Sequence, residues 1–251
     1  MRPLAFAALL ALAAGAPRAQ RAPMPPAKIA VRIPINPAPG QPRLSPRQWA
    51  EIGAVALTGV GQLATSQAGV SDAYIPVVVA GWGGYLGYRE ATESGYFASL
   101  GFTGEGLGPA FRDASIVAGV AAAGMVAVGA AQGTLRADAT VLPLLVLYPA
   151  WGLTQQALVQ GMVTRNLQDA GVSPVAVTPI SAAAFGAVHV PNWELTAATT
   201  AMGAAYAGLY QRHRNVWPLG IYHGVLGAAF YVWVLDRDPW QELVNGDFGG
   251  E

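Results

Sequence analysis

The stretch Thr154-Gln155-Gln156-Ala157-Leu158-Val159-Gln160-Gly161 places three glutamines inside a long apolar run, residues 139–162. A polar side chain in an apolar environment costs free energy unless it has a hydrogen-bond partner, so such residues mark either a site or bonding between helices. Two later apolar runs each contain one histidine, His189 and His223, which could supply these partners. We therefore expect the functional residues to lie where these three segments meet.

The composition is that of a membrane protein. Of the 251 residues, 53% are hydrophobic and only 11% are charged, and the mean hydropathy is +0.36. Soluble enzymes are less apolar and more highly charged than this. Lys plus Arg and Asp plus Glu are balanced at 14 each, so the charge gives no indication of nucleic-acid binding. The absence of cysteine excludes disulfides, thiol catalysis and thiolate metal sites.

The apolar runs predict an all-α fold, a polytopic membrane bundle of about seven transmembrane helices. Small residues four apart, such as Ala118 with Ala122 and Gly203 with Ala207, permit close helix packing in such a bundle. The expected transmembrane helices are residues 52–68, 73–88, 114–131, 139–162, 175–190, 195–210 and 217–235.

Five segments are expected along the chain. Residues 1–20 resemble a signal peptide or a short anchor, and residues 21–48 form a proline-rich basic arm. Nine of the 19 prolines lie within residues 17–46. N-terminal transmembrane helices occupy 49–138, the core that carries the glutamines and histidines occupies 139–235, and an acidic tail follows at 236–251.

The basic residues predict the orientation in the membrane. With the arm in the cytoplasm, eleven basic residues fall inside and only Arg136 and Arg237 fall outside, as the positive-inside rule requires. We therefore expect an integral protein of the plasma (inner) membrane with a cytoplasmic N-terminal arm. Cleavage of residues 1–20 as a signal peptide would place the arm outside, so whether these residues are cleaved is left open.

Three pairs of residues are spaced to form stripes on three helices. Residues four apart lie on one face of an α-helix. Gln156 therefore pairs with Gln160, Phe185 with His189, and His223 with Gly227. At about 1.5 Å per residue the three stripes reach a similar depth, so we expect Gln155, Gln156, His189 and His223 to line one cavity.

This order of motifs resembles the CAAX protease and bacteriocin-processing (CPBP) family, which includes the type II CAAX prenyl endopeptidases. The resemblance covers about residues 139–235, and residues 181–189 and 208–223 are similar to the family's second and third motifs. It implies a membrane-embedded endopeptidase that hydrolyses a peptide bond at the membrane. The implied partners are membrane lipid and a membrane-tethered or lipid-modified protein substrate. The positions matching the catalytic motif are Gln155, Gln156, His189 and His223, and the implied substrate-binding positions are Gln160, Phe185 and Gly227.

The chain departs from the family pattern at the residues that carry the chemistry. The family's first motif, Glu-Glu-x-x-x-Arg, reads Gln155, Gln156 and Gln160 here, and the asparagine of the third motif is Gly227. In the family the glutamate is thought to activate a water, and the asparagine helps to stabilise the oxyanion. A neutral amide cannot accept that proton. Because general-base catalysis contributes typically about 10²- to 10⁴-fold, we expect impaired catalysis.

Other sources of activity and other functions remain open at this point. Within residues 139–235 the only acids are Asp169 and Glu194, both in predicted loops, and Glu194 could fold back over the site. Two histidines without an anionic third ligand fall short of the usual three protein ligands of catalytic zinc, so we expect no metal or other cofactor. The alternatives are an inactive pseudoprotease that binds a membrane peptide or lipid-linked partner and, less favoured, a small transporter.

Overall fold

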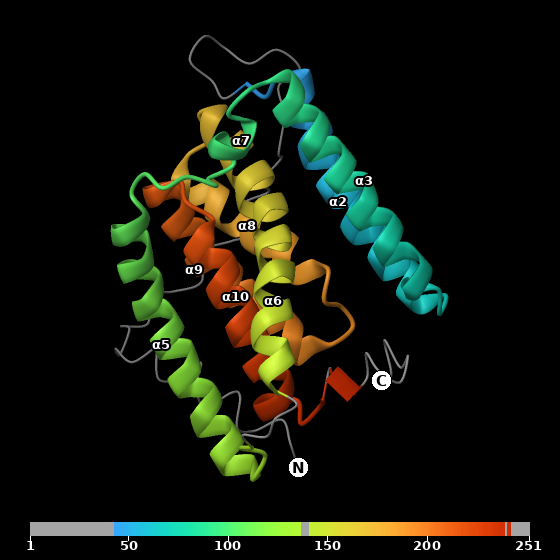
Figure 1. Cartoon of the computed structure of the whole chain (residues 1–251), viewed down its shortest axis with the longest axis vertical. Helices are drawn as coiled ribbons and strands as arrows, with labels where there is room; N and C mark the ends of the chain where they lie inside the picture. Colours follow the sequence, from blue (N-terminus) through green and yellow to red (C-terminus); the bar gives the residue numbers. More distant parts are fainter. Residues whose placement is uncertain (1–42, 137–140, 239, 242–251) are drawn as a thin grey trace, which may run out of the picture. The chain divides into compact units, whose positions relative to one another are not determined.

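The structure, a computed structural model, describes residues 43–136, 141–238 and 240–241 (Figure 1). The predicted segment 1–20, the arm up to residue 42, residues 137–140, and residues 239 and 242–251 of the predicted tail lie outside the described residues. Within the described part every regular element is helical, so the all-α prediction is confirmed. The elements are α2 (Pro46–Gln67), α3 (Ser71–Thr92), α4 (Tyr96–Ser99), α5 (Leu107–Gln132), α6 (Val141–Gln156), the π-helix η1 (Ala157–Thr164), α7 (Arg165–Asp169), α8 (Pro174–Ala187), α9 (Trp193–His213), α10 (Trp217–Ala229) and the π-helix η2 (Phe230–Val234).

The first described helix begins earlier than expected. The arm was predicted to reach residue 48, but α2 starts at Pro46. Ser45 Oγ accepts a hydrogen bond from the Gln48 backbone N–H at 3.3 Å, and Gln48 Oε1 accepts one from the Ser45 backbone N–H at 2.8 Å. This capping box satisfies two backbone donors at the helix start, and proline is favoured in the first helical position. Pro46 therefore begins a helix rather than ending the arm.

One described helix, α5, is long and apolar enough to cross a membrane by length and composition. Large apolar side chains on α5 are exposed, as at Ile116 and Val120. Contact with the hydrocarbon of a bilayer is more favourable for such side chains than contact with water. The predicted number of seven transmembrane helices is not tested by this observation and stays a prediction.

Glycines allow α6 and α10 to cross almost backbone to backbone, and Figure 1 shows the two helices side by side. A β-carbon on Gly224 would lie 2.2 Å from the Pro149 backbone nitrogen, and one on Gly152 would lie 2.4 Å from the Gly220 backbone oxygen. No side chain fits at these positions without moving a helix. Gly220 and Gly224 are four apart on α10, which is the small-residue spacing that lets membrane helices approach closely.

A second close contact joins α8 to α9. A β-carbon on Gly203 would lie 3.0 Å from Ala182 Cα and 3.2 Å from Phe185 Cβ. Gly203 is one of the small residues expected to permit close packing, and this expectation is confirmed. The contact fixes the position of Phe185, whose side chain is almost fully buried.

The helix that carries the glutamines changes its hydrogen-bonding pattern immediately after Gln156. Residues 139–162 were predicted as a single transmembrane helix, but α6 passes into η1 at Ala157 and then into α7, which ends at Asp169. All eight residues of η1 are buried, and Leu158 and Met162 belong to one hydrophobic cluster with Val55 of α2. Extended π-helical segments are rare and occur frequently at functional sites. Because all its residues are buried, η1 lies in the core of the described fold.

We expect the substitution Gly224→Ala to destabilise the protein, because its β-carbon would force α6 and α10 apart. Overpacking of this kind typically costs about 1–3 kcal/mol. The matched control is Gly84→Ala within α3, where a β-carbon would meet nothing within 4 Å. The control should be neutral or stabilising, by about 0.5–1 kcal/mol. Thermal unfolding in detergent measures both variants, and equal midpoints would contradict the proposed tight crossing.

Candidate functional site

The α6–α10 crossing brings one predicted pair of site residues into direct contact. Gln156 is the last residue of α6, and its Nε2 lies 3.1 Å from His223 Nδ1 on α10. Gln156 is fully buried and His223 is 8% exposed. The sequence prediction that the glutamine helix meets a histidine of a later helix holds for these two residues.

The other histidine joins them through an aromatic ring. The ring centroid of Phe185 lies 5.5 Å from that of His189 and 5.1 Å from that of His223, and both contacts are edge to face. Such contacts orient rings as well as burying them. Gln156, Phe185, His189 and His223 therefore converge from α6, from α8 with the turn that follows it, and from α10.

His189 lies in a turn rather than on a helix. The helix was expected to cover residues 175–190, but α8 ends at Ala187. Pro191 follows closely, and helices usually end at or before the residue preceding a proline. His189 Nδ1 lies 2.9 Å from the Phe185 backbone oxygen. Because a carbonyl oxygen can only accept a hydrogen bond, Nδ1 holds the proton, and in the neutral ring Nε2 is the basic nitrogen.

The amide of Gln156 is only half satisfied by the described residues. Its Nε2 bonds to His223, whereas its Oε1 is buried and has no hydrogen-bond partner in this part of the chain. Turning the amide over would let Oε1 accept from His223 Nδ1–H and would leave the NH₂ group in the same position. In either orientation a polar atom next to His223 can receive another hydrogen-bonding group, such as a water or a peptide group.

Gln160 belongs to a different group of contacts. Thr164 Oγ1 lies 2.7 Å from Gln160 Oε1 and 2.8 Å from Ser181 Oγ on α8. All three side chains are buried. None of the hydrogen bonds among the described residues joins this group to His189 or His223. Gln156 and Gln160 are therefore both buried, but Gln156 bonds to α10 whereas Gln160 bonds to Thr164 of its own helix.

The remaining predicted residues, Gln155 and Gly227, lie beside the site without a hydrogen bond to it. Gln155 precedes Gln156 and is partly buried. A β-carbon on Gly227 would lie 4.0 Å from His223 Cδ2 and 3.7 Å from Tyr148 Cδ1. These are ordinary van der Waals distances, so the family's asparagine position lies near His223 here and has room for a β-carbon.

Among the residues that the structure describes, no carboxylate is part of this site. Asp169 pairs with Arg214 at 2.6 Å, and Glu194 is exposed in the first turn of α9. In the described ranges, neither acid makes a hydrogen bond or an ion pair with His189 or His223. Nor does any group of three or more His, Cys, Asp or Glu side chains there lie close enough together to hold a metal ion.

Comparison with known proteins gives one match. Residues 137–229 match the family described as Type II CAAX prenyl endopeptidase Rce1-like. The chain carries a domain of this family. The family predicted from the motifs is thus confirmed, and the matched segment contains every predicted site residue from Gln155 to Gly227. No curated protein and no solved structure matches the chain. The chain is a CAAX-protease-like membrane protein with glutamines in the first motif of its Rce1-like domain.

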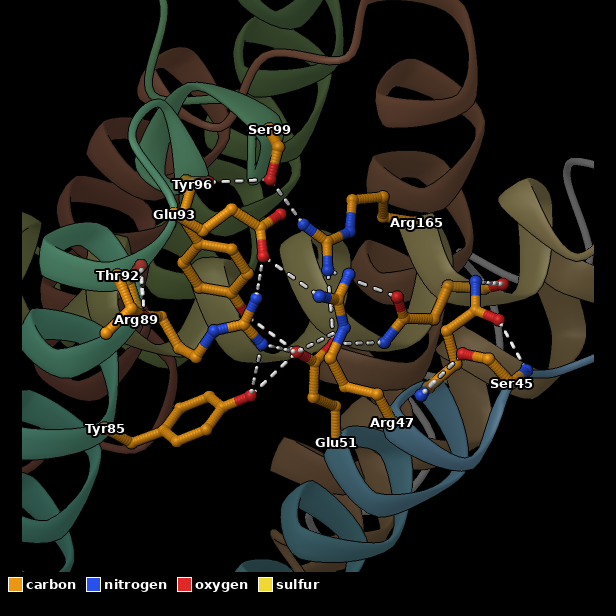
Figure 2. A network of polar contacts seen from close by, with 12 residues as sticks. Ser45, Arg47, Glu51, Tyr85, Arg89, Thr92, Glu93, Tyr96, Ser99 and Arg165 are labelled. Carbon is orange, nitrogen blue, oxygen red and sulfur yellow. Dashed lines mark hydrogen bonds and ion pairs between the residues drawn. The ribbon is translucent and has the colours of Figure 1, made fainter.

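Sequence reasoning missed a buried carboxylate outside the Rce1-like domain. Glu51 of α2 is 3% exposed. Its Oε1 accepts hydrogen bonds from Tyr85 at 2.8 Å and from Tyr96 at 2.9 Å, and it lies 3.4 Å from Arg89 Nη1 (Figure 2). The Arg89 guanidinium carbon also lies 4.5 Å from the centre of the Tyr96 ring. This side of the carboxylate is bound by α3 and α4.

The other oxygen of Glu51 binds the Rce1-like domain. Glu51 Oε2 accepts from Asn166 Nδ2 at 2.6 Å and from Arg165 Nη2 at 3.2 Å. Arg165 is 4% exposed, and its Nη1 donates to Ser99 Oγ at 2.7 Å. The Glu51 network, defined as Glu51 with the residues that contact its two oxygens, therefore joins α2, α3 and α4 to the start of α7. The sequence contains one indication of this network, because Glu51 is an acid directly before the apolar run 52–68.

Replacing Glu51 by glutamine should destabilise the protein strongly, because it leaves the buried Arg165 without its counter-charge, whereas Arg89 keeps Glu93. Removing one partner of a buried pair costs about 3–5 kcal/mol. The control Glu93→Gln removes an equal charge from a side chain that is 48% exposed, and should cost at most about 1 kcal/mol. Unfolding titrations in detergent compare the two. Equal losses of stability would mean that the Glu51 network does not hold α2 to the domain.

Proposed function

We propose that this protein is a membrane-embedded endopeptidase of the CPBP type with impaired catalysis. It would bind a membrane-tethered or lipid-modified protein at the histidine pair and hydrolyse one peptide bond slowly. The observation that carries the proposal is the convergence of Gln156, Phe185, His189 and His223, four positions that match the family's motifs by resemblance.

The arrangement leaves His189 with a free basic nitrogen in the site. Its Nδ1–H is held by the Phe185 carbonyl, so its Nε2 can accept a proton from an attacking water. The water oxygen would add to the scissile carbonyl carbon, and the same proton would pass to the departing amine. Gln156 cannot share in this proton transfer because an amide is not basic. Gly227 provides no side-chain donor for the oxyanion.

A second function is favoured by one observation. Gln156 and His223 form a buried amide–imidazole contact in which neither group requires a charge. An amide with one unsatisfied polar atom is suited to bind a peptide group, because it can donate or accept a hydrogen bond. The alternative is therefore a pseudoprotease that binds a membrane peptide or lipid-linked partner in the same place without cutting it.

The charge distribution of the helix ends supports the proposed orientation in the plasma (inner) membrane. Arg212 at the end of α9 lies 3.1 Å from Asp113 at the start of α5. Arg136, which follows the end of α5, pairs instead with Asp236 at 2.7 Å. Arg212, assigned to the inside, and Arg136, assigned to the outside, thus lie at opposite ends of α5, as the proposal of a cytoplasmic N-terminal arm requires.

Cleavage of membrane-tethered peptides in proteoliposomes tests the function. The substrates are a matched pair of peptide panels, with and without a prenylated cysteine near the C-terminus. We expect slow cleavage by the natural protein and a gain of up to about 10²- to 10⁴-fold in the double variant Gln155→Glu, Gln156→Glu, which restores the general base. Adding His189→Ala to that variant should abolish the gain.

The control is Gln62→Glu with Gln67→Glu, which adds the same two charges to α2, outside the Rce1-like domain. A gain in this control equal to that of the site variant would argue against a role for Gln155 and Gln156. Peptide that crosslinks to the natural protein, with no cleavage by either the natural or the restored form, would favour the pseudoprotease.

A further inference from the structure

A groove of about 880 Å³ runs between α2 and α3, outside the Rce1-like domain. One end of the groove is charged and the rest is largely apolar. Ala54 of α2 and Val77, Val78 and Gly81 of α3 line the apolar part. Val77 is 69% exposed, so this wall is open to the surroundings of the protein. The sequence predicts that residues 73–88 cross the membrane, and hydrocarbon would then surround this wall.

The charged end holds equal numbers of opposite charges. Arg47 and Glu51 come from α2, and Arg89 and Glu93 come from the end of α3 (Figure 2). Arg47 Nη1 donates to Glu93 Oε2 at 3.0 Å, and these two side chains are 52% and 48% exposed. Glu51 and Arg89 lie beneath them and are buried. Arg47 and Glu93 are therefore the two groups of this cluster that a ligand can reach.

The polar groups along the apolar part are satisfied within the protein. Trp82 Nε1 donates to Thr58 Oγ1 at 3.1 Å, and Tyr74 donates to the Thr58 backbone oxygen at 2.8 Å. A bound peptide would place its backbone amides against a surface that offers them few partners, which is costly. A hydrocarbon chain makes no such demand. The apolar part of the groove is therefore suited to an acyl chain.

We propose that the α2–α3 groove binds one zwitterionic phospholipid. The acyl chain lies along Ala54, Val77, Val78 and Gly81. The phosphate bonds to the Arg47 guanidinium, and the ammonium group of the headgroup bonds to the Glu93 carboxylate. The four charged side chains of the groove sum to zero, so a zwitterion adds no uncompensated charge, whereas an anionic lipid adds a negative charge beside Glu93.

Native mass spectrometry of the full-length protein tests the proposal. Delipidated protein in detergent is mixed with equal amounts of phosphatidylethanolamine, phosphatidylcholine and phosphatidylglycerol that have identical acyl chains. We expect one retained lipid, with each zwitterionic species preferred over the anionic species by about fivefold, the factor that corresponds to a half-exposed charge contact. Equal retention of the three lipids, or a preference for phosphatidylglycerol, would overturn the proposal.

Two variants locate the bound lipid. Val77→Trp fills the apolar part of the groove and should reduce lipid retention by about tenfold or more, whereas Val60→Trp, at a similarly exposed valine of α2 outside the groove, should not. Arg47→Gln should weaken retention by about tenfold because it removes the phosphate contact. Arg112→Gln, at an exposed arginine outside the groove, is its control. Unchanged retention in Val77→Trp or Arg47→Gln, with unfolding midpoints kept, would place the lipid elsewhere and reject the proposal.

Discussion

The contact between the backbones of α6 and α10 determines where the candidate site forms. Gly152, Gly220 and Gly224 remove the side chains that would otherwise separate these helices. His223 directly precedes Gly224, and Gln156 lies one helical turn beyond Gly152, so the closest part of the crossing also aligns the two polar groups. Lipid chains are as apolar as leucine, so helices in a bilayer associate through close packing and hydrogen bonds rather than through the hydrophobic effect. This crossing has both.

The sequence predicted the helical class and the meeting of the glutamine helix with the two histidine segments, because polar residues in apolar runs need partners. Spacing alone did not predict that Gln160 would bond to Thr164 on the same helix, near Ser181, instead of joining the histidines. A spacing of four residues fits an α-helix, and nothing in the apolar pattern marked the change to a π-helix at Ala157. The Glu51 network was missed because its partners lie up to 115 positions away in the chain, and no local pattern indicates such pairings.

The helix from α6 to α7 passes through two polar environments of opposite kind. At Gln156 the buried contact is between groups that need no charge, whereas at Arg165 a guanidinium and a carboxylate are buried together. The second arrangement is sensitive to the loss of either partner, since an unpaired buried charge is costly. The α2–α3 pair is therefore joined to the Rce1-like domain by an interaction that requires exact pairing as well as by the apolar contacts of Val55.

The open position at Gly227 means that the backbone does not enforce the unusual chemistry of this domain. A β-carbon there would meet its neighbours at ordinary contact distances, and glutamine has nearly the same size and shape as glutamate. Gly227 could therefore accept a β-carbon, and Gln155 and Gln156 could be exchanged for glutamate of nearly equal size, without moving a helix. In evolutionary terms, these three positions could each change on their own within the same backbone.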